Sequence, residues 1–261
     1  MARSYGLAEQ FLASWLDRRD LPDGTLIVGS KWGYRYTADW QIGVAVHEVK
    51  DHSLATLRRQ LVESRRLLGD RLSLYQVHSA TLESGVLDDR AVLAELVALG
   101  EGNLQIGLTT SGPRQAEVLR RALAVEIDGR QPFTTVQATW NVLEPSVGAA
   151  LAEAHAAGWG VIVKEALANG RLAQPGPGHA RAVLRAIARR RTTTVDAVAL
   201  AATRAQPWAD IVLSGAATTA QLASNLSAAS VELEPDDLAD LAGLVETPER
   251  YWAERSALPW N

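Results

Sequence analysis

The 261-residue chain contains no cysteine, which excludes disulfide bonds and thiolate metal ligands. It also has no excess of positive charge, since 26 lysines and arginines stand against 30 aspartates and glutamates. A net charge of −4 provides no basic patch for nucleic acid or anionic lipid, so we expect a small-molecule partner. No apolar run approaches the roughly 20 residues of a membrane span, and the first residues lack the pattern of a signal peptide. We therefore expect a cytoplasmic protein.

Six short runs rich in apolar and β-branched residues recur along the chain, and each is followed by a segment of helical periodicity. They are nearly continuous in apolar residues rather than alternating, which is typical of strands buried on both faces of a parallel sheet. The repeated strand–helix order predicts an α/β fold. The predicted strands lie at residues 25–31, 72–78, 104–110, 134–140, 160–166 and 211–216.

Two predicted helices carry clear apolar stripes. Leucines at positions 54, 57, 61 and 68 recur at helical spacing, and Asp51 and Ser53 precede them as cap candidates. The first helix of the chain has a stripe of the same kind. It consists of Leu7, Phe11, Leu12, Trp15 and Leu16.

A parallel sheet of this order is either an open, doubly wound sheet or a closed (β/α)8 barrel. No strand runs into a G-x-G-x-x-G turn, which argues against an open dinucleotide-binding sheet. Polar residues instead stand at the C-terminal ends of the strands, where barrel enzymes build their active sites. Each taken alone is equally well explained by satisfying backbone groups at a strand end, but together they favour a site. They are Lys31, His78, Thr109, Gln137, Asn141, Lys164, Glu165 and Ser214.

The order of seven segments resembles the aldo-keto reductase family over nearly the whole chain. They are "ARSYGLAEQFLASWL", "LIVGSKWGY", "LYQVHS", "IGLTTSG", "VQATWNVLEPS", "VIVKEALANGRL" and "VLSGAATTAQLASNL". In that family a (β/α)8 barrel binds a nicotinamide cofactor at the strand ends and reduces a carbonyl with a tyrosine, a lysine, a histidine and an aspartate. The resemblance implies one barrel domain over residues 1–261 and an NAD(P)(H)-dependent reductase of a small aldehyde, ketone or sugar.

Three catalytic roles follow from the resemblance. Tyr5 matches the proton donor, Lys31 the cation beside it, and His78 the residue that orients the substrate carbonyl. Hydride addition leaves an alkoxide, and a phenol with a pKa near 10 donates its proton poorly unless an ammonium stabilises the phenolate. A histidine that hydrogen-bonds the carbonyl oxygen stabilises the charge that accumulates there.

The cofactor residues implied by the resemblance form two groups. Thr109 and Gln137 match the residues that bind the nicotinamide carboxamide in the family, and Asn141 lies near enough in the sequence to contribute. Lys164 stands where many members place an aromatic ring that stacks on the nicotinamide. Many members also pair a lysine and an arginine with the 2′-phosphate of NADP, and this chain has neither there. NADP is therefore only slightly favoured over NAD. The residues matching the adenosine-phosphate site are Ser214, Gly215, Thr218, Gln221 and Asn225.

The aspartate of the family pattern Asp-x-Ala-x-x-Tyr-Gly lies five positions before the tyrosine, and counting back from Tyr5 reaches position zero. With six strands counted instead of eight, we expect a barrel that is partial at its N-terminus and lacks a strand–helix–strand segment. A full barrel implies a monomer, whereas a truncated one implies association through its free strand edges. Because the aspartate is missing from the four catalytic residues of the family, a second interpretation stays open, namely a homologue that binds cofactor or a partner protein without turnover.

Two further features have plain interpretations. The histidines of "HEVKDH", His47 and His52, are five positions apart, which is wrong for the i, i+4 pair of a metal-binding helix, so we assign no metal site. Near the C-terminus, Trp252 and Trp260 either cover the pocket or pack on the barrel wall.

Overall fold

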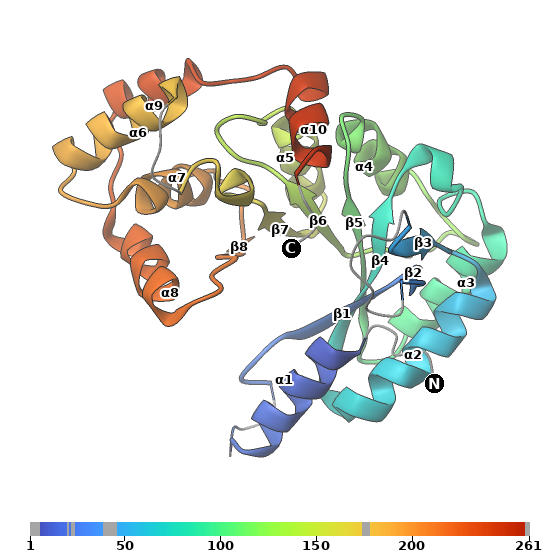
Figure 1. Cartoon of the computed structure of the whole chain (residues 1–261). Coiled ribbons are helices and arrows are strands. Elements are labelled where there is room, and N and C mark those ends of the chain that lie inside the picture. The colour runs from blue at the N-terminus through green and yellow to red at the C-terminus, as the bar shows by residue number, and fades with distance from the viewer. Residues whose placement is uncertain (1–5, 20, 22–23, 39–45, 174–177, 259–261) are drawn as a thin grey trace. The chain divides into compact units, whose positions relative to one another are not determined.

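The computed structural model describes residues 6–19, 21, 24–38, 46–173 and 178–258 (Figure 1). Tyr5 and Trp260 lie outside these ranges. The chain divides into two compact units. The first comprises the described residues up to Thr110 together with Arg120–Thr135, and the second comprises Ser111–Leu119 and the chain from Val136 onward. Within the described ranges, no helix is long and apolar enough to cross a bilayer.

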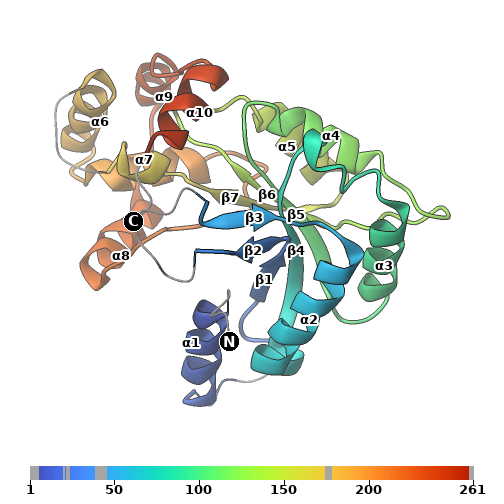
Figure 2. The ribbon, with the colours of Figure 1, turned by 45° about the vertical axis from the view of Figure 1, so that its right-hand side comes forward.

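The first unit is built on three parallel strands in the order β1-β4-β5. Helices α2 and α3 lie side by side along them (Figure 2), and a short antiparallel hairpin, β2–β3, follows β1. All three strands coincide with predicted ones. The elements of this unit are α1 (Leu7–Asp17), β1 (Val28–Trp32), β2 (Tyr34–Tyr36), β3 (Glu48–Lys50), α2 (Leu54–Leu68), η1 (Gly69–Arg71), β4 (Leu72–Ala80), η2 (Leu82–Ser84), α3 (Arg90–Gly100) and β5 (Gln105–Thr110).

Helix α2 begins and packs as its sequence predicts. The Ser53 side chain caps it by accepting a hydrogen bond from the Thr56 backbone N–H at 3.3 Å. Asp51 accepts hydrogen bonds from the Ser53 N–H and the Thr56 hydroxyl, and these bonds lower the pKa of its carboxyl to about 2. Three of its four stripe leucines, at positions 57, 61 and 68, are buried in the core.

Helix α1 forms where predicted, but its apolar stripe is only partly buried. Leu16 is buried, whereas Leu7 is 52% and Phe11 72% exposed. The reason lies in Glu9, which turns inward and accepts hydrogen bonds from the hydroxyls of Ser30 and Ser64. A carboxylate anchored to β1 and α2 sets which face of α1 packs, and Phe11 is left on the outside.

The second unit holds the other three strands, in the order β6-β7-β8, with β7 and β8 parallel. All six strands predicted from the sequence are thus present in the described residues. Their alternation with helices is that of the (β/α)8 barrel class. Helix α4 (Gln115–Leu123) is divided between the units, and β6 belongs to the second from Val136 onward. The remaining elements are β6 (Thr135–Thr139), α5 (Gly148–Ala156), β7 (Gly160–Lys164), η3 (Ala168–Gly170), α6 (His179–Arg190), α7 (Val195–Arg204), β8 (Ile211–Val212), α8 (Thr219–Leu226), η4 (Ser227–Ser230), α9 (Pro235–Ala242) and α10 (Pro248–Ser256).

The core of the second unit gathers residues of α6, α7, α9 and α10 into one apolar cluster. Trp252 belongs to this cluster and is 8% exposed, so it packs inside the unit rather than over an opening. Beside the cluster, the Asp237 side chain is 1% exposed and pairs with Arg190 and Arg191. This paired carboxylate ties the start of α9 to the end of α6.

Candidate functional site

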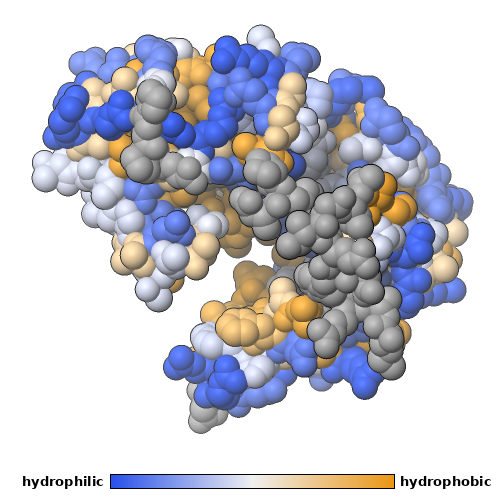
Figure 3. Space-filling view, viewed as in Figure 1, coloured by the Kyte–Doolittle hydropathy of each residue, from blue (hydrophilic) through white to orange (hydrophobic). Residues whose placement is uncertain are grey.

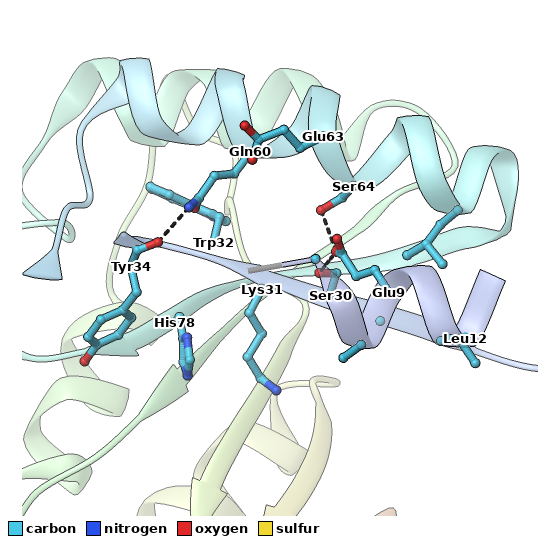
Figure 4. Close-up of a pocket in the computed structure, with 14 residues that line it drawn as sticks. Glu9, Leu12, Ser30, Lys31, Trp32, Tyr34, Gln60, Glu63, Ser64 and His78 are labelled. Atoms are coloured by element: carbon cyan, nitrogen blue, oxygen red, sulfur yellow. Dashed lines mark hydrogen bonds between the residues drawn. The ribbon is translucent and has the colours of Figure 1, made fainter. Parts of the chain in front are cut away.

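Two of the three predicted catalytic residues line one pocket of the first unit (Figure 4). The pocket has a volume of about 290 Å³ and lies between α1, β1, α2 and the end of β4. Lys31 enters it from β1 and His78 from β4. Parallel pairing places Lys31 opposite Gln76, two residues before His78, which is why both side chains reach the same opening. Tyr5, the third, is outside the described residues.

Lys31 presents a cation to this pocket. Figure 4 shows its side chain extending away from β1 beside His78. The side chain is exposed, and among the described residues no acceptor is hydrogen-bonded to its ammonium. The surrounding protein still removes part of its water, and this desolvation lowers the pKa of the ammonium. An ammonium without a protein partner is available to a phenolate or a bound ligand.

His78 is half-buried and is held through both its backbone and its ring. The His52 ring donates from Nε2 to the His78 carbonyl oxygen at 2.9 Å. The ring of Tyr34 meets the His78 ring edge-on, with 4.8 Å between centroids. These contacts fix His78 at the pocket wall, with its ring beside Lys31.

A second set of hydrogen bonds holds the backbone just after Lys31, which forms part of the pocket wall. Gln60 on α2 accepts from the Gly33 N–H at 2.9 Å and donates to the Tyr34 carbonyl at 2.7 Å (Figure 4). The Gln60 side-chain amide thus holds the backbone at Gly33 and Tyr34. Tyr34 and Gln60 were not predicted as pocket residues, because a tyrosine just beyond a predicted strand and a glutamine on a helix carry no pattern that points to a pocket.

Thr109 lies at the end of β5 and is fully buried. Its hydroxyl accepts a hydrogen bond from the Ser79 N–H at 2.7 Å. The predicted carboxamide-binding threonine is therefore bonded to the residue directly after His78, within the first unit.

In the second unit, Gln137 stands in the middle of β6 and is 6% exposed. Its amide makes no hydrogen bond with the part of the chain that the structure describes. Lys164, at the end of β7, donates to Thr139 at 2.9 Å and to Ser111 at 3.3 Å, and its ammonium lies 3.8 Å from Glu165. The cation at the predicted aromatic position is thus partly neutralised by its neighbour.

Asn141 is buried, and its amide is committed to the protein. Its Oδ1 accepts from the N–H groups of Leu143 and Glu144, and its Nδ2 donates to the Glu165 carbonyl and to the Tyr251 hydroxyl. These four bonds hold the segment after β6 against β7 and α10. The Asn141 side chain therefore has a structural role, whereas its predicted role near the cofactor stays a prediction.

A cavity of about 650 Å³ lies at the ends of β7 and β8 and at the start of α8. Four of the five residues predicted for the adenosine-phosphate site line it. Thr218, the fifth, caps α8 by accepting a hydrogen bond from the Gln221 N–H at 3.1 Å, and the Gln221 side chain accepts one from the Thr218 N–H at 3.2 Å. The lining residues predicted from sequence are Ser214, Gly215, Gln221 and Asn225, together with Lys164.

The same cavity has a mixed charge. Asn225 holds its rim by donating to the Ser214 carbonyl at 2.9 Å, and Gly215 adopts a φ of +62°, which suits glycine. Of the described residues that line it, Lys164 is the one cation, while Glu165 and Asp196 are acidic. Asp196 was not predicted, because an acidic residue in the first turn of a helix is ordinary. The start of α8 offers backbone N–H groups to an anion.

The chain resembles known proteins over most of its length. The model of the aldo/keto reductase family matches residues 1–246. Among solved structures, the chain is similar to the aldo-keto reductase AKR11C1 from Bacillus halodurans, with 22% identity, a TM-score of 0.69, and coverage of 93% of this chain and 79% of that one. The glycerol dehydrogenase AKR11B4 from Gluconobacter oxydans has 17% identity, a TM-score of 0.68, and coverage of 98% and 80%. No curated protein sequence matches the chain.

Proposed function

The chain belongs to the aldo/keto reductase family, whose members are oxidoreductases, and from this premise we propose that it interconverts a small aldehyde, ketone or sugar carbonyl and the corresponding alcohol. The observation that carries the proposal is the shared pocket of Lys31 and His78. A cation without a hydrogen-bond partner among the described residues and an imidazole at one opening are groups suited to stabilise the charge that develops when a hydride adds to a carbonyl.

We assign His78 to the substrate oxygen. Its ring lines the pocket, and its backbone is held by His52, so a hydrogen bond from the ring reaches a fixed point. Negative charge grows on a carbonyl oxygen during hydride addition, and a preorganised donor at that point lowers the barrier.

We assign Tyr5 as the proton donor and Lys31 as the group that makes it competent. An ordinary phenol has a pKa near 10 and therefore keeps its proton at neutral pH. A nearby ammonium favours the phenolate and so eases proton release. Lys31 suits this role because no described residue neutralises its charge. Because the pKa of Lys31 is lowered, its ammonium loses its charge at a lower pH than that of an ordinary lysine.

The residues of the second unit fit a nicotinamide dinucleotide, which supplies the hydride when bound and is oxidised as the carbonyl is reduced. The amide of Gln137, which makes no hydrogen bond with the described residues, suits a carboxamide, which both donates and accepts hydrogen bonds. The cavity at the start of α8 suits a phosphate, because backbone N–H groups gather at a helix N-terminus. Lys164 completes the proposed binding residues of this unit, where Asn141 would support the site by holding the end of β6 through its bonds to the protein. Thr109 is the cofactor residue proposed for the first unit.

We further propose that the chain uses both NADPH and NADH, with a small preference for NADPH. Strong selection for the 2′-phosphate rests on cations that pair with it. In the described lining of the α8 cavity, Lys164 stands alone as a cation and lies 3.8 Å from the Glu165 carboxylate.

Two measurements on the folded protein test the proposal. Titration with NADPH or NADH should quench part of the fluorescence of its eight tryptophans, and Gln137→Ala should weaken that binding about tenfold, as expected for loss of a hydrogen-bonding amide. Mixing the complex with small aldehydes, ketones and sugars should then consume the reduced nucleotide. Saturable binding without turnover of any carbonyl would favour a cofactor-binding homologue, and absence of binding would end the proposal.

A further inference from the structure

Near the end of β4 the pairing with β5 is interrupted by an irregularity between Val77 and Ala80, and the backbone there, called the His78–Ser79 turn below, is strained. Ser79 adopts a φ of +52°, in the left-handed region that side chains other than glycine rarely occupy. A backbone conformation of this kind persists only where the surroundings determine it. The question is which groups hold the backbone at His78 and Ser79 in place.

Three side chains from two segments, the end of β3 with the residues just after it and the end of β5, bind this turn. His52 Nε2 lies 2.9 Å from the His78 carbonyl oxygen, and Lys50 Nζ lies 2.8 Å from the Ser79 carbonyl oxygen. From the end of β5, the Thr109 hydroxyl accepts from the Ser79 N–H at 2.7 Å. Both carbonyls and the amide between them are therefore bonded to side chains.

The form of His52 is set by its contacts. A carbonyl oxygen only accepts, so Nε2 carries the hydrogen, and Nδ1 is buried without a hydrogen-bond partner in the described residues. Desolvation lowers the pKa of this imidazole, in keeping with a neutral ring. Glycine at position 33 makes room for it, since a Cβ atom there would lie 2.2 Å from His52 Cδ2. The Trp32 ring meets it edge-on at 5.6 Å.

The β2–β3 hairpin also holds the ring of His78. Tyr34 on β2 packs edge-on against it with 4.8 Å between centroids, and Lys50 at the end of β3 lies 5.6 Å from the Tyr34 ring centroid. One ammonium thus contacts both the tyrosine that flanks His78 and the carbonyl that follows it. Backbone and ring of His78 are fixed from the same hairpin and the residues just after it.

We propose that His52 and Lys50 are positioning residues for His78, holding the strained His78–Ser79 backbone so that the imidazole keeps one direction in the pocket. The inference rests on the proposed function for its catalytic meaning. Its structural content, that these two side chains hold the turn, stands apart from turnover and can be measured without it.

Four variants separate the claim from a general loss of packing. His52→Leu keeps bulk but removes the donor, whereas His52→Gln restores an amide donor. Lys50→Met removes the bond to Ser79. Arg35→Met is the matched control, because Arg35 lies on the same hairpin but pairs with Asp51 at 3.3 Å and has no bond to the turn.

The first readout is hydrogen exchange at the Ser79 amide together with the NMR signals of the His78 imidazole. In His52→Leu and Lys50→Met we expect exchange at Ser79 to rise about tenfold or more and the His78 signals to shift, because local opening becomes easier. His52→Gln should return exchange to within about threefold of the parent, and Arg35→Met should leave it unchanged. Unchanged exchange and signals in both His52→Leu and Lys50→Met would overturn the proposal.

The second readout is steady-state kinetics. A misdirected catalytic group lowers kcat, so His52→Leu should reduce kcat about tenfold while nucleotide affinity stays within about twofold, with recovery in His52→Gln. Equal losses in the leucine and glutamine variants would overturn the positioning role. A parent protein that never turns over, but whose Ser79 exchange responds as expected, would refute the proposed function and leave the turn contacts established.

Discussion

Asn141 Nδ2 lies 3.0 Å from the phenolic oxygen of Tyr251, a residue 110 positions later in the chain. Both side chains are almost completely buried. The bond joins the segment after β6 to α10 inside the second unit, and the Arg171 guanidinium lies over the same ring, 5.5 Å from its centroid. Helix α10 is therefore attached to a strand end by a specific polar contact as well as by the apolar cluster around Trp252.

Removal of this hydroxyl should weaken the second unit. In Tyr251→Phe, Asn141 loses one buried hydrogen-bond partner but keeps the Glu165 carbonyl, so we expect the free energy of unfolding to fall by about 1–2 kcal/mol. Urea denaturation followed by circular dichroism measures it. Leu258→Ala, at a position 41% exposed just beyond α10, serves as the control and should change stability by less than about 0.5 kcal/mol. Equal stability of Tyr251→Phe and the parent would show that the bond contributes nothing.

The second prediction concerns the choice of nucleotide. NADPH should be favoured over NADH by less than about tenfold, or roughly 1.4 kcal/mol, because the described lining of the α8 cavity offers Lys164 as its one cation. Fluorescence titration with both nucleotides measures the ratio. Gln221→Arg should raise the preference for NADPH by adding a bidentate phosphate ligand, while Gln221→Glu should lower it. A preference near a thousandfold in the parent would mean that the phosphate binds elsewhere.

The third prediction concerns proton donation. Tyr5→Phe should abolish carbonyl reduction and leave nucleotide affinity within about twofold, because it removes the transferable proton and little else. Lys31→Met should have a similar effect through the pKa of the phenol, and Lys31→Arg should retain part of the activity by keeping the charge. Near-normal turnover in Tyr5→Phe would exclude this tyrosine as the donor.

The fourth prediction concerns pH and the buried Asp237. Burial alone would raise the pKa of this carboxyl, but hydrogen bonds from Arg190, the Glu234 N–H and Arg191 outweigh it, and the pKa is lowered. A lowered folded-state pKa stabilises the protein above the unfolded pKa near 3.9, and the contribution is lost as the pH falls through the folded value.

Asp237→Asn should therefore reduce the free energy of unfolding by about 1–3 kcal/mol at neutral pH, with the difference shrinking as the pH falls below about 4. Asp240→Asn is the matched control, since Asp240 also pairs with Arg190 at 2.7 Å but its side chain is 47% exposed; we expect less than about 1 kcal/mol there. A difference between Asp237→Asn and the parent that persisted unchanged in acid would exclude ionisation of Asp237 as its source.

The strands were predictable from sequence, whereas many of the contacts that shape the pocket were not. Buried parallel strands are continuous apolar runs, so the six strands of the larger sheet appear at the expected places, whereas the hairpin β2–β3 was not predicted. The Lys31–His78 pair follows from the same alignment of strand ends. By contrast, Glu9 turning inward, Gln60 bonding to Tyr34, and Lys50 and His52 bonding to the turn after His78 depend on segments tens of residues apart. Such contacts arise from tertiary packing and leave no local periodicity to detect.

The last prediction concerns association through the edge of β1. In the described part of the chain β1 pairs with β4 on one side only, and Leu26 and Ile27, just before it, are 44% and 71% exposed. Figure 3 shows hydrophobic side chains at the surface over α1 and the start of β1. A free strand edge with apolar side chains beside it pairs readily with another chain, so we expect concentration-dependent self-association of this chain in light scattering.

Ile27→Lys should reduce that association, because a charge beside an edge strand opposes pairing with a second copy. Val62→Lys on α2 is the matched control, since Val62 is 69% exposed but does not lie on a strand edge, and we expect it to behave as the parent does. A parent protein that stays monomeric at every concentration tested, or two lysine variants with the same effect, would show that the edge of β1 does not drive association.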